Sequence, residues 1–307
     1  MKRGTIVVGA RGSLLSVRQT EGVIRILRTR HPRCSFRLEK ITTLGDRAAA
    51  WKRSDTGIFV KEIEDALVKG KIDIAVHSVK DMPSKLPAKL FLAAVTRRED
   101  PRDILIARRG ADLFRLPAGC CIGTSSLRRQ AQILHIRPDA CLSELRGNLD
   151  TRIRKLQEGL YDAIVVAVVG LRRLGIKHAK GCLIPETIML PQTGQGALGI
   201  EIRRNDREAS QLVKCLDDAA AHACIAAERA FLRETKAGCR MPVAALATIA
   251  GARMTMEGLI ISLDGRKMIR LRCEGPRENA QVLGTRLARQ VLKNGGAQIL
   301  KEIRNAE

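Results

Sequence analysis

The stretch that decides the fold lies near the N-terminus, where residues 5–30 read TIVVGARGSLLSVRQTEGVIRILRTR. The apolar run Thr5–Gly9 is typical of a buried strand, and Leu14–Arg30 repeats apolar residues at helical spacing. Similar segments follow it: a strand is expected at residues 36–41, a helix at 58–69 and a strand at 72–77. Strands that alternate with helices predict a largely parallel sheet covered on both faces.

The alternation begins again after RREDP at residues 97–101. We expect strands at residues 104–107, 121–123, 141–145 and 163–169, with helices near 126–136 and 149–158. A glycine-rich return segment then leads to a strand at 199–202. Beyond about residue 217 the pattern becomes a helix (217–235), three strands (245–250, 254–261, 267–273) and two helices (277–293, 296–304). The sequence therefore predicts two α/β units followed by an α+β module.

The composition is that of a folded protein, because 45% of the 307 residues are hydrophobic and 28% are charged. No apolar run approaches the roughly 18 residues of a membrane span. The N-terminal apolar run is also too short for a secretory signal, so we expect a cytoplasmic protein with no membrane partner. Nine cysteines without a C-x-x-C pair favour free thiols in a reducing compartment and no metal site.

The formal net charge of +23 is spread along the whole chain and attracts polyanions of any kind. Single-stranded nucleic acid is usually bound on aromatic stacking platforms, and this chain has only one Trp, one Tyr and five Phe. We therefore expect no specific nucleic-acid partner, although adventitious binding stays open. A site for a small molecule with several negative charges fits the composition better.

Arginine recurs where an expected strand leads into an expected helix, at Gly9–Ser13, Gly123–Arg129 and Leu145–Arg152. A cation at a helix N-terminus is unfavourable by roughly 0.3–1 kcal/mol because of the helix dipole. A bound anion reverses this effect, since free N–H groups and guanidinium groups then converge on it. Three such junctions predict an anion-binding cleft, and the alternative is a set of solvated arginines. Their spacing does not distinguish a carboxylate ligand from a phosphate.

Two further motifs have both a chemical and an ordinary interpretation. Asp81 follows a strand within HSVKDMP, where a carboxylate beside Lys80 can assist proton transfer. The same residues also suit a plain turn before Pro83. Cys239 follows a glycine within AGCRMP, which is compatible with an exposed, reactive thiol or with one ordinary cysteine among nine.

Seven motifs, taken in order, resemble the hydroxymethylbilane synthase (porphobilinogen deaminase) family. They are ARGSLLSVRQ (10–19), HSVKDMPS (77–84), GTSSLRRQAQ (123–132), LRGNLDTR (145–152), YDAIVVAVVGLRRLG (161–175), LPQTGQGALGIE (190–201) and AGCRMPVAA (237–245). The resemblance implies a transferase of tetrapyrrole and heme biosynthesis. Such an enzyme condenses four porphobilinogens head to tail, with loss of ammonia, to give hydroxymethylbilane.

The family builds its product on a dipyrromethane cofactor held by a thioether, and the cysteine that carries it corresponds to Cys239. The catalytic aspartate corresponds to Asp81, with Lys80 beside it. The resemblance further implies cofactor contacts from Lys80, Asp81, Thr124, Ser125, Ser126, Arg128, Arg129 and Gln195. It implies substrate contacts from Arg11, Ser13, Arg146, Arg152 and Arg173. Porphobilinogen carries two carboxylates, which agrees with the arginine-rich junctions.

The family architecture implies two periplasmic-binding-protein-like α/β domains and a third, smaller α+β domain, in a monomer. Domain 1 would comprise residues 1–96 and 199–216, domain 2 residues 101–193, and domain 3 residues 219–307. The chain departs from the family at 54–59, which lacks the lysine common in the mobile loop, and Lys52 and Arg53 are its possible substitutes. A non-catalytic anion-binding protein of the same two-domain fold is the second reading. The missing secretion signal and the presence of both Asp81 and Cys239 disfavour it.

Overall fold

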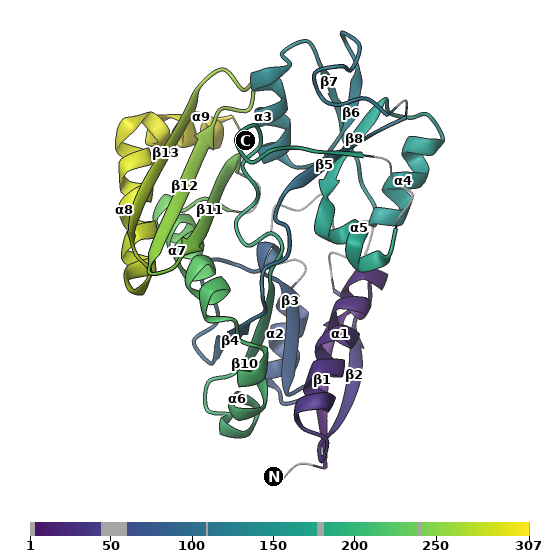
Figure 1. Ribbon diagram of the computed structural model, residues 1–307, viewed down its shortest axis with the longest axis vertical. Helices are drawn as coiled ribbons and strands as arrows, with labels where there is room; N and C mark the ends of the chain where they lie inside the picture. The colour runs from purple at the N-terminus through teal and green to yellow at the C-terminus, as the bar shows by residue number, and fades with distance from the viewer. Residues whose placement is uncertain (1–3, 44–59, 109, 177–180, 239–240, 307) are drawn as a thin grey trace. The chain divides into compact units, whose positions relative to one another are not determined.

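A computed structural model of the protein describes residues 4–43, 60–108, 110–176, 181–238 and 241–306. The chain divides into two compact units (Figure 1). One unit comprises residues 1–99 and 196–225, and the other comprises residues 100–195 and 226–307. Three sheets, two in the second unit, match the expected fold class of two α/β domains and a smaller α+β domain.

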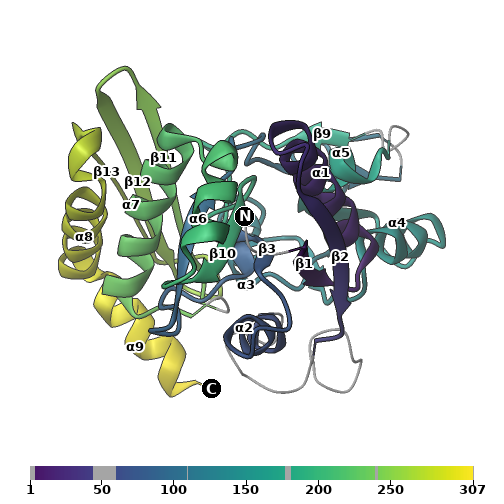
Figure 2. The same ribbon diagram turned by 90° about the horizontal axis from the view of Figure 1, so that it is seen from below.

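The first unit contains a five-stranded mixed sheet in the order β2-β1-β3-β10-β4. Its strands are β1 (Thr5–Arg11), β2 (Ser35–Ile41), β3 (Ile74–Ser78), β4 (Leu90–Val95) and β10 (Leu198–Arg203). Its helices are α1 (Leu14–Arg30), α2 (Lys61–Val68) and α6 (Arg207–Val213). Side chains alternate across β1, so Ile6 and Val8 pack with α1 while Val7 packs with α2. Helices therefore cover both faces of this sheet, as Figure 2 shows for α1 and α2.

The second unit contains another five-stranded sheet, in the order β7-β6-β8-β5-β9. Its strands are β5 (Asp103–Ala107), β6 (Cys121–Gly123), β7 (Cys141–Ser143), β8 (Ala163–Ala167) and β9 (Gly181–Leu183). Its helices are α3 (Leu127–Ile136), α4 (Leu149–Gln157) and α5 (Val168–Leu174). Ile133 of α3 lies in the core on one face, and Leu156 of α4 lies in the core on the other.

The third sheet is an antiparallel meander of β11 (Val243–Ala250), β12 (Arg253–Ile261) and β13 (Met268–Pro276). The helices around it are α7 (Ala219–Thr235), α8 (Ala280–Val291) and α9 (Ala297–Asn305). One face packs on α7 and α8, where Gly258 approaches Phe231 and Leu287. The other face shares a core with Ala131 of α3, which explains why the second and third sheets belong to one compact unit.

Three expectations are corrected by this arrangement. The two larger sheets are mixed rather than largely parallel, because β10 and β5 each run antiparallel to both of their neighbours. The strand expected at 163–169 ends at Ala167, and α5 begins at once. The sequence pattern also missed β4, β9 and α6. Among the described residues, none of the helices has the length and apolar character needed to cross a bilayer.

Candidate anion-binding and catalytic residues

Four of the expected site residues belong to one edge of the first sheet. β1 and β3 are parallel neighbours with Gly9 opposite Ala75, so both strands finish at the same edge. Arg11 is the last residue of β1, and Ser13 caps α1 by accepting a hydrogen bond from the Ser16 N–H at 3.3 Å. Lys80 and Asp81 follow β3 at that edge, where ligands of open α/β sheets usually bind.

Asp81 ends a single 3₁₀ turn, Val79–Asp81, whose neighbours are firmly anchored. The buried Val79 donates its N–H to the Ala197 carbonyl at 3.1 Å, and the buried Met82 donates its N–H back to the Val79 carbonyl at 3.1 Å. Lys80 and Asp81 are only half-buried. The turn therefore holds a carboxylate and an ammonium in a fixed place while leaving both accessible to a ligand.

The sequence analysis missed a buried pair behind this turn. His77 Nε2 lies 3.1 Å from Glu201 Oε2, which joins β3 to β10, and both side chains are almost completely buried. Ser78, the next residue, contacts Gln19 of α1 through their side chains at 3.4 Å. The strand leading to Asp81 is thus held from two sides. Only the strand pairing reveals this, since His77 and Glu201 are 124 residues apart.

The second sheet brings three more junctions to one edge, because β6 is parallel to both β7 and β8. Hydrogen bonds join the loops that follow β6 and β7. Thr124 donates its N–H to the Ser143 carbonyl at 2.9 Å. The Ser125 hydroxyl donates to the Leu145 carbonyl at 2.7 Å and accepts from the Leu145 N–H at 3.1 Å. Neither Ser126 nor Asn148, the N-cap residues of α3 and α4, uses its side chain to cap its helix within the described chain.

Arg128 and Arg129 are buried and converge on one carboxylate, which the sequence did not predict. Arg128 Nη2 donates to Asp103 Oδ2 at 2.7 Å, and Arg129 Nη2 donates to Asp103 Oδ1 at 2.8 Å. Gln195 Nε2 also donates to Asp103 Oδ1, at 2.9 Å. Asp103 is completely buried, and the two guanidinium groups hold its pKa well below the usual range despite desolvation.

This cluster carries more positive than negative charge. Two guanidinium groups face one carboxylate, so the pairing leaves one positive charge in a buried place. Burial, together with the nearby Arg129 charge, lowers the pKa of Arg128, and Arg128 Nε has no hydrogen-bond partner among the described residues. A negatively charged group at the N-terminal end of α3 would therefore be stabilised by both the cluster and the helix dipole.

The remaining expected arginines follow β7 and β8 of the second sheet and differ in their contacts. Arg152 donates from Nε to the Gly147 carbonyl at 2.8 Å, within its own loop. Arg146 forms a surface ion pair with Glu144 at 2.6 Å, and a pair of this kind contributes little stability. Arg173 is half-buried on α5, directly after β8. The structure thus groups these residues with Thr124–Arg129 around the ends of β6, β7 and β8.

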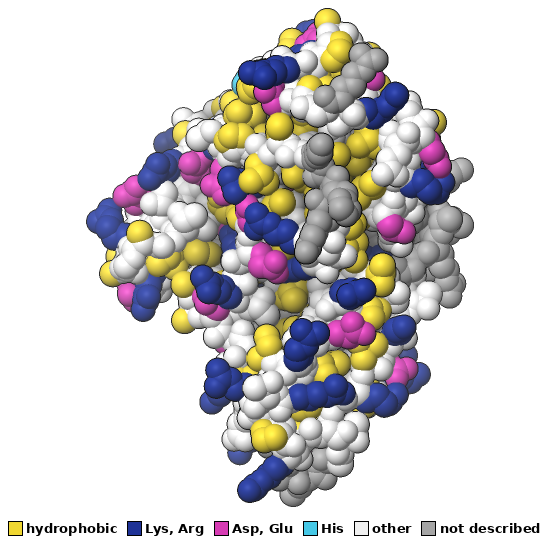
Figure 3. Space-filling view, turned by 45° about the vertical axis from the view of Figure 1, so that its right-hand side comes forward, with side chains coloured by type: hydrophobic (Ala, Val, Ile, Leu, Met, Phe, Trp, Pro, Cys, Tyr) yellow, Lys and Arg dark blue, Asp and Glu magenta, His cyan; other side chains and the backbone are white. Residues whose placement is uncertain are grey.

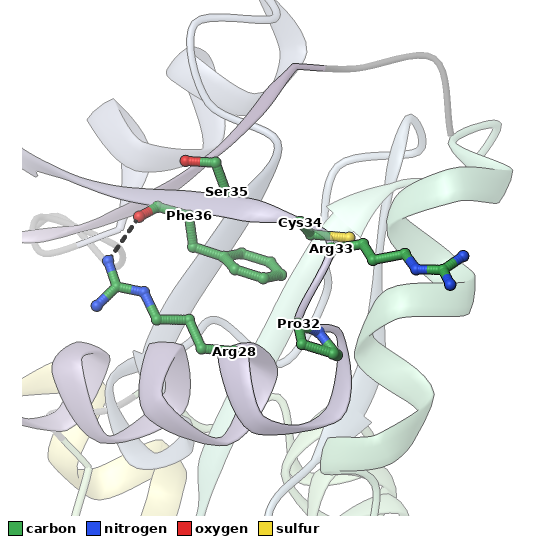
Figure 4. A pocket seen from close by; sticks show the side chains of 6 residues that line it. All are labelled: Arg28, Pro32, Arg33, Cys34, Ser35 and Phe36. Carbon is green, nitrogen blue, oxygen red and sulfur yellow. Dashed lines mark hydrogen bonds between the residues drawn. The ribbon is translucent and has the colours of Figure 1, made fainter.

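A surface pocket of about 550 Å³ lies elsewhere on the first unit (Figure 4). Arg28, Pro32, Arg33, Cys34, Ser35 and Phe36 line it. Arg28 Nη2 donates to the Phe36 carbonyl at 2.9 Å, while Arg33 extends away from the Phe36 ring. The pocket lies where β2 begins, which is the opposite edge of the sheet from Arg11, so it is separate from the expected site.

Some expected residues are not among those described. Cys239 and the Lys52 and Arg53 positions lie outside the described residues. The eight cysteines that are described are free thiols. The site residues that the structure does describe form two groups, one on each unit, and each group lies where parallel strands end.

Comparison with known proteins gives one consistent family. Residues 6–211 match "Porphobilinogen deaminase, dipyromethane cofactor binding domain", and residues 222–293 match "Porphobilinogen deaminase, C-terminal domain". The porphobilinogen deaminase of Pelotomaculum thermopropionicum is 46% identical over 100% of this chain and 99% of its own length. That of Desulforudis audaxviator is 45% identical over 98% and 99%, respectively. Among solved structures, the BvgS VFT2 domain of Bordetella pertussis gives a TM-score of 0.44 at 14% identity, covering 70% of this chain and 87% of that one.

Proposed function

Because this chain belongs to the porphobilinogen deaminase family, transferases that condense porphobilinogen in tetrapyrrole synthesis, we propose which of its residues carry the reaction. The family has a dipyrromethane cofactor. We assign Cys239 as its point of attachment and Asp81 as the catalytic carboxylate. We also propose domains of 1–96 with 199–216, 101–193 and 219–307, in a cytoplasmic monomer.

The donor set of the second unit fits the carboxylates of the cofactor. The observation that carries this assignment is the buried cluster, in which the two positive charges of Arg128 and Arg129 face the single negative charge of Asp103. Asp103 accepts from both guanidinium groups and is itself held by Gln195, so the direction of the two arginines is set before any ligand arrives. A carboxylate next to Ser126 and the first turn of α3 would meet N–H donors and an uncompensated positive charge.

When bound, the dipyrromethane supplies the pyrrole chain onto which porphobilinogen is condensed. Asp81 can accept a hydrogen bond from a pyrrole N–H of the substrate through its carboxylate. The same negative charge stabilises the cation that develops on porphobilinogen when ammonia leaves. Val79 and Met82 keep this carboxylate in place, and the half-buried Lys80 lies beside it on the same turn.

Substrate carboxylates are assigned to Arg11 and Ser13 on the first unit and to Arg146, Arg152 and Arg173 on the second. Ser13 is the N-cap residue of α1, so the first turn of this helix holds its N–H and hydroxyl in place. Arg146 forms an ion pair with a surface carboxylate, and a substrate carboxylate can replace that partner at little energetic cost. Thr124 and Ser125 support the loops between these arginines through their hydrogen bonds.

The proposal is tested by the mass of the intact protein. Purified protein should carry the mass of one dipyrromethane, and Cys239→Ser should carry none while melting at a similar temperature. Cys182→Ser is the matched control, because Cys182 is an exposed thiol on the edge strand β9. We expect that control to keep the added mass. Normal porphobilinogen turnover by the Cys239→Ser protein would remove Cys239 from its assigned role.

A further inference from the structure

Two cysteines face each other across β6 and β7, at positions that the proposed function does not use. Cys121 and Cys141 are register partners in a parallel pair. The hydrogen bond from the Cys141 N–H to the Cys120 carbonyl, at 2.9 Å, fixes this register. Adjacent strands lie about 4.8 Å apart, and registered residues of parallel strands project to the same side of the sheet.

The packing around the two strands shows which side that is. Cys121 packs against the core cluster on the α4 face, together with Leu145 and Ile164. Its neighbour Cys120 packs into the opposite cluster, and so does Leu142, the residue after Cys141. Because side chains alternate along a strand, the Cys121 and Cys141 thiols share the α4 face, and the Cys120 thiol lies on the other face.

The two thiols differ in how easily a reagent reaches them. Cys141 is exposed, whereas Cys121 is partly buried. Burial, together with the nearby Asp162 carboxylate and Cys141, raises the pKa of the Cys121 thiol. Asp162 is held close by accepting the Cys121 N–H at 2.8 Å. An incoming reagent should therefore react first at Cys141, and Cys121 should act second.

We propose that Cys121 and Cys141 form an oxidisable dithiol that a small-molecule disulfide converts into a cross-strand disulfide. The Cys141 thiolate attacks one sulfur of the reagent, which releases one thiol and leaves a mixed disulfide on Cys141. Cys121 then loses its proton to solvent and attacks Cys141 Sγ, which releases the second thiol. In total, two protein thiols and one reagent disulfide give one protein disulfide and two reagent thiols.

The geometry of the strands suits this cross-link. The strand spacing of about 4.8 Å falls within the Cα separations of roughly 4.4–6.8 Å that disulfides span. β6 and β7 end only two residues after these cysteines, at Gly123 and Ser143. Oxidation would thus join the bases of two loops, one that leads to Arg128 in α3 and one that contains Arg146. The inference concerns only these thiols and holds whatever the fate of Cys239.

The probe is glutathione disulfide, which is added to the whole folded protein. The remaining free thiols are then blocked, and the protein is digested with trypsin for peptide mapping. We expect a linked pair of peptides, 116–128 and 130–146, that has lost two hydrogens and separates again with a reductant. Peptide 116–128 contains both Cys120 and Cys121. Fragmentation of the linked wild-type peptides must place the bond on Cys121, and a bond on Cys120 would overturn the proposal.

Two variants and one unchanged cysteine supply the matched controls. Cys120→Ser should keep the link, because Cys120 faces the opposite core. Cys121→Ser should lose it and leave Cys141 as a mixed disulfide with glutathione. Cys182, which stands opposite Leu105 and is exposed, should form only a mixed disulfide in every protein. Wild-type protein that carries glutathione on Cys141 but forms no link would contradict the proposal, and this result needs no variant to fold.

Discussion

At the scale of single residues, Asp81 is the group whose negative charge the reaction requires. Replacing it by Asn keeps the shape of the side chain and removes the charge, so we expect porphobilinogen consumption to fall to near zero. Asp81→Glu keeps the charge but displaces it by one methylene, for which we expect a loss of about 10²-fold. Steady-state consumption of porphobilinogen by cofactor-loaded protein measures both effects.

Folding should be insensitive to these changes, because the buried Val79 and Met82 anchor the turn and Asp81 itself is half-buried. The melting temperatures of wild type, Asp81→Asn and Asp81→Glu therefore serve as the control. An Asp81→Asn enzyme that turns over porphobilinogen at the wild-type rate would show that the carboxylate is not catalytic.

For Asp103 we expect a loss of stability rather than a direct loss of catalysis. Asp103→Asn would leave the Arg128 and Arg129 charges buried without their counterion. Breaking a buried ion pair in this way costs about 3–5 kcal/mol of unfolding free energy. Urea unfolding of the two proteins at neutral pH measures the difference. A change of less than about 1 kcal/mol would mean that water or a neighbouring anion already compensates the arginines.

The Asp103 carboxylate also makes the stability of the folded protein depend on pH. Because its pKa is lowered in the folded protein, the stability that Asp103 contributes is complete above its ordinary pKa of 3.8. That contribution decreases as the pH falls below this value and is lost as the pH falls through the lowered pKa. The stability difference between wild type and Asp103→Asn should therefore be constant from pH 5 upward and shrink in acid. A difference that grew on acidification would contradict the assigned direction.

At the scale of elements, the contact between α7 and α8 depends on a glycine. A Cβ atom at Gly284 of α8 would lie 2.0 Å from the carbonyl oxygen of Ala227 in α7. Backbone cannot move aside as a side chain does, so Gly284→Ala should force the two helices apart. We expect a loss of about 1–3 kcal/mol in unfolding free energy, measured by urea unfolding.

Gly22 is the matched control, since it also lies within a helix (α1) but has open space around its Cβ position. Gly22→Ala should raise stability by roughly 0.5–1 kcal/mol, because alanine loses less backbone freedom in a helix. Equal effects at the two positions would show that the close approach of α7 and α8 does not limit stability.

At the scale of the whole molecule, the net charge of +23 predicts weak binding to any nucleic acid. Figure 3 shows Lys and Arg scattered among other residues over the face drawn, with acidic residues between them. Random double-stranded DNA should bind at low salt, and its affinity should fall steeply between about 50 and 200 mM salt. Fluorescence anisotropy with several unrelated sequences measures this, and a reproducible preference for one sequence would contradict a purely electrostatic origin.

The sequence alone determined the features that depend on neighbours along the chain. The bounds of α1 and β6 agree with those expected, and the three junctions predicted to bind anions all lie between a strand and a helix. Hydrophobic periodicity and the glycine, serine and arginine at each junction carry this information within a few residues. The family motifs, being local, could likewise be found in order.

Only the tertiary structure decided how distant segments pair. The antiparallel direction of β10 and β5 depends on which strands each one pairs with, and strand periodicity is the same for either direction. The Asp103 carboxylate reaches Arg128 across 25 residues, and His77 reaches Glu201 across 124. No local pattern encodes such pairs, because their energy comes from burial of both groups together, and burial exists only once the sheets have formed.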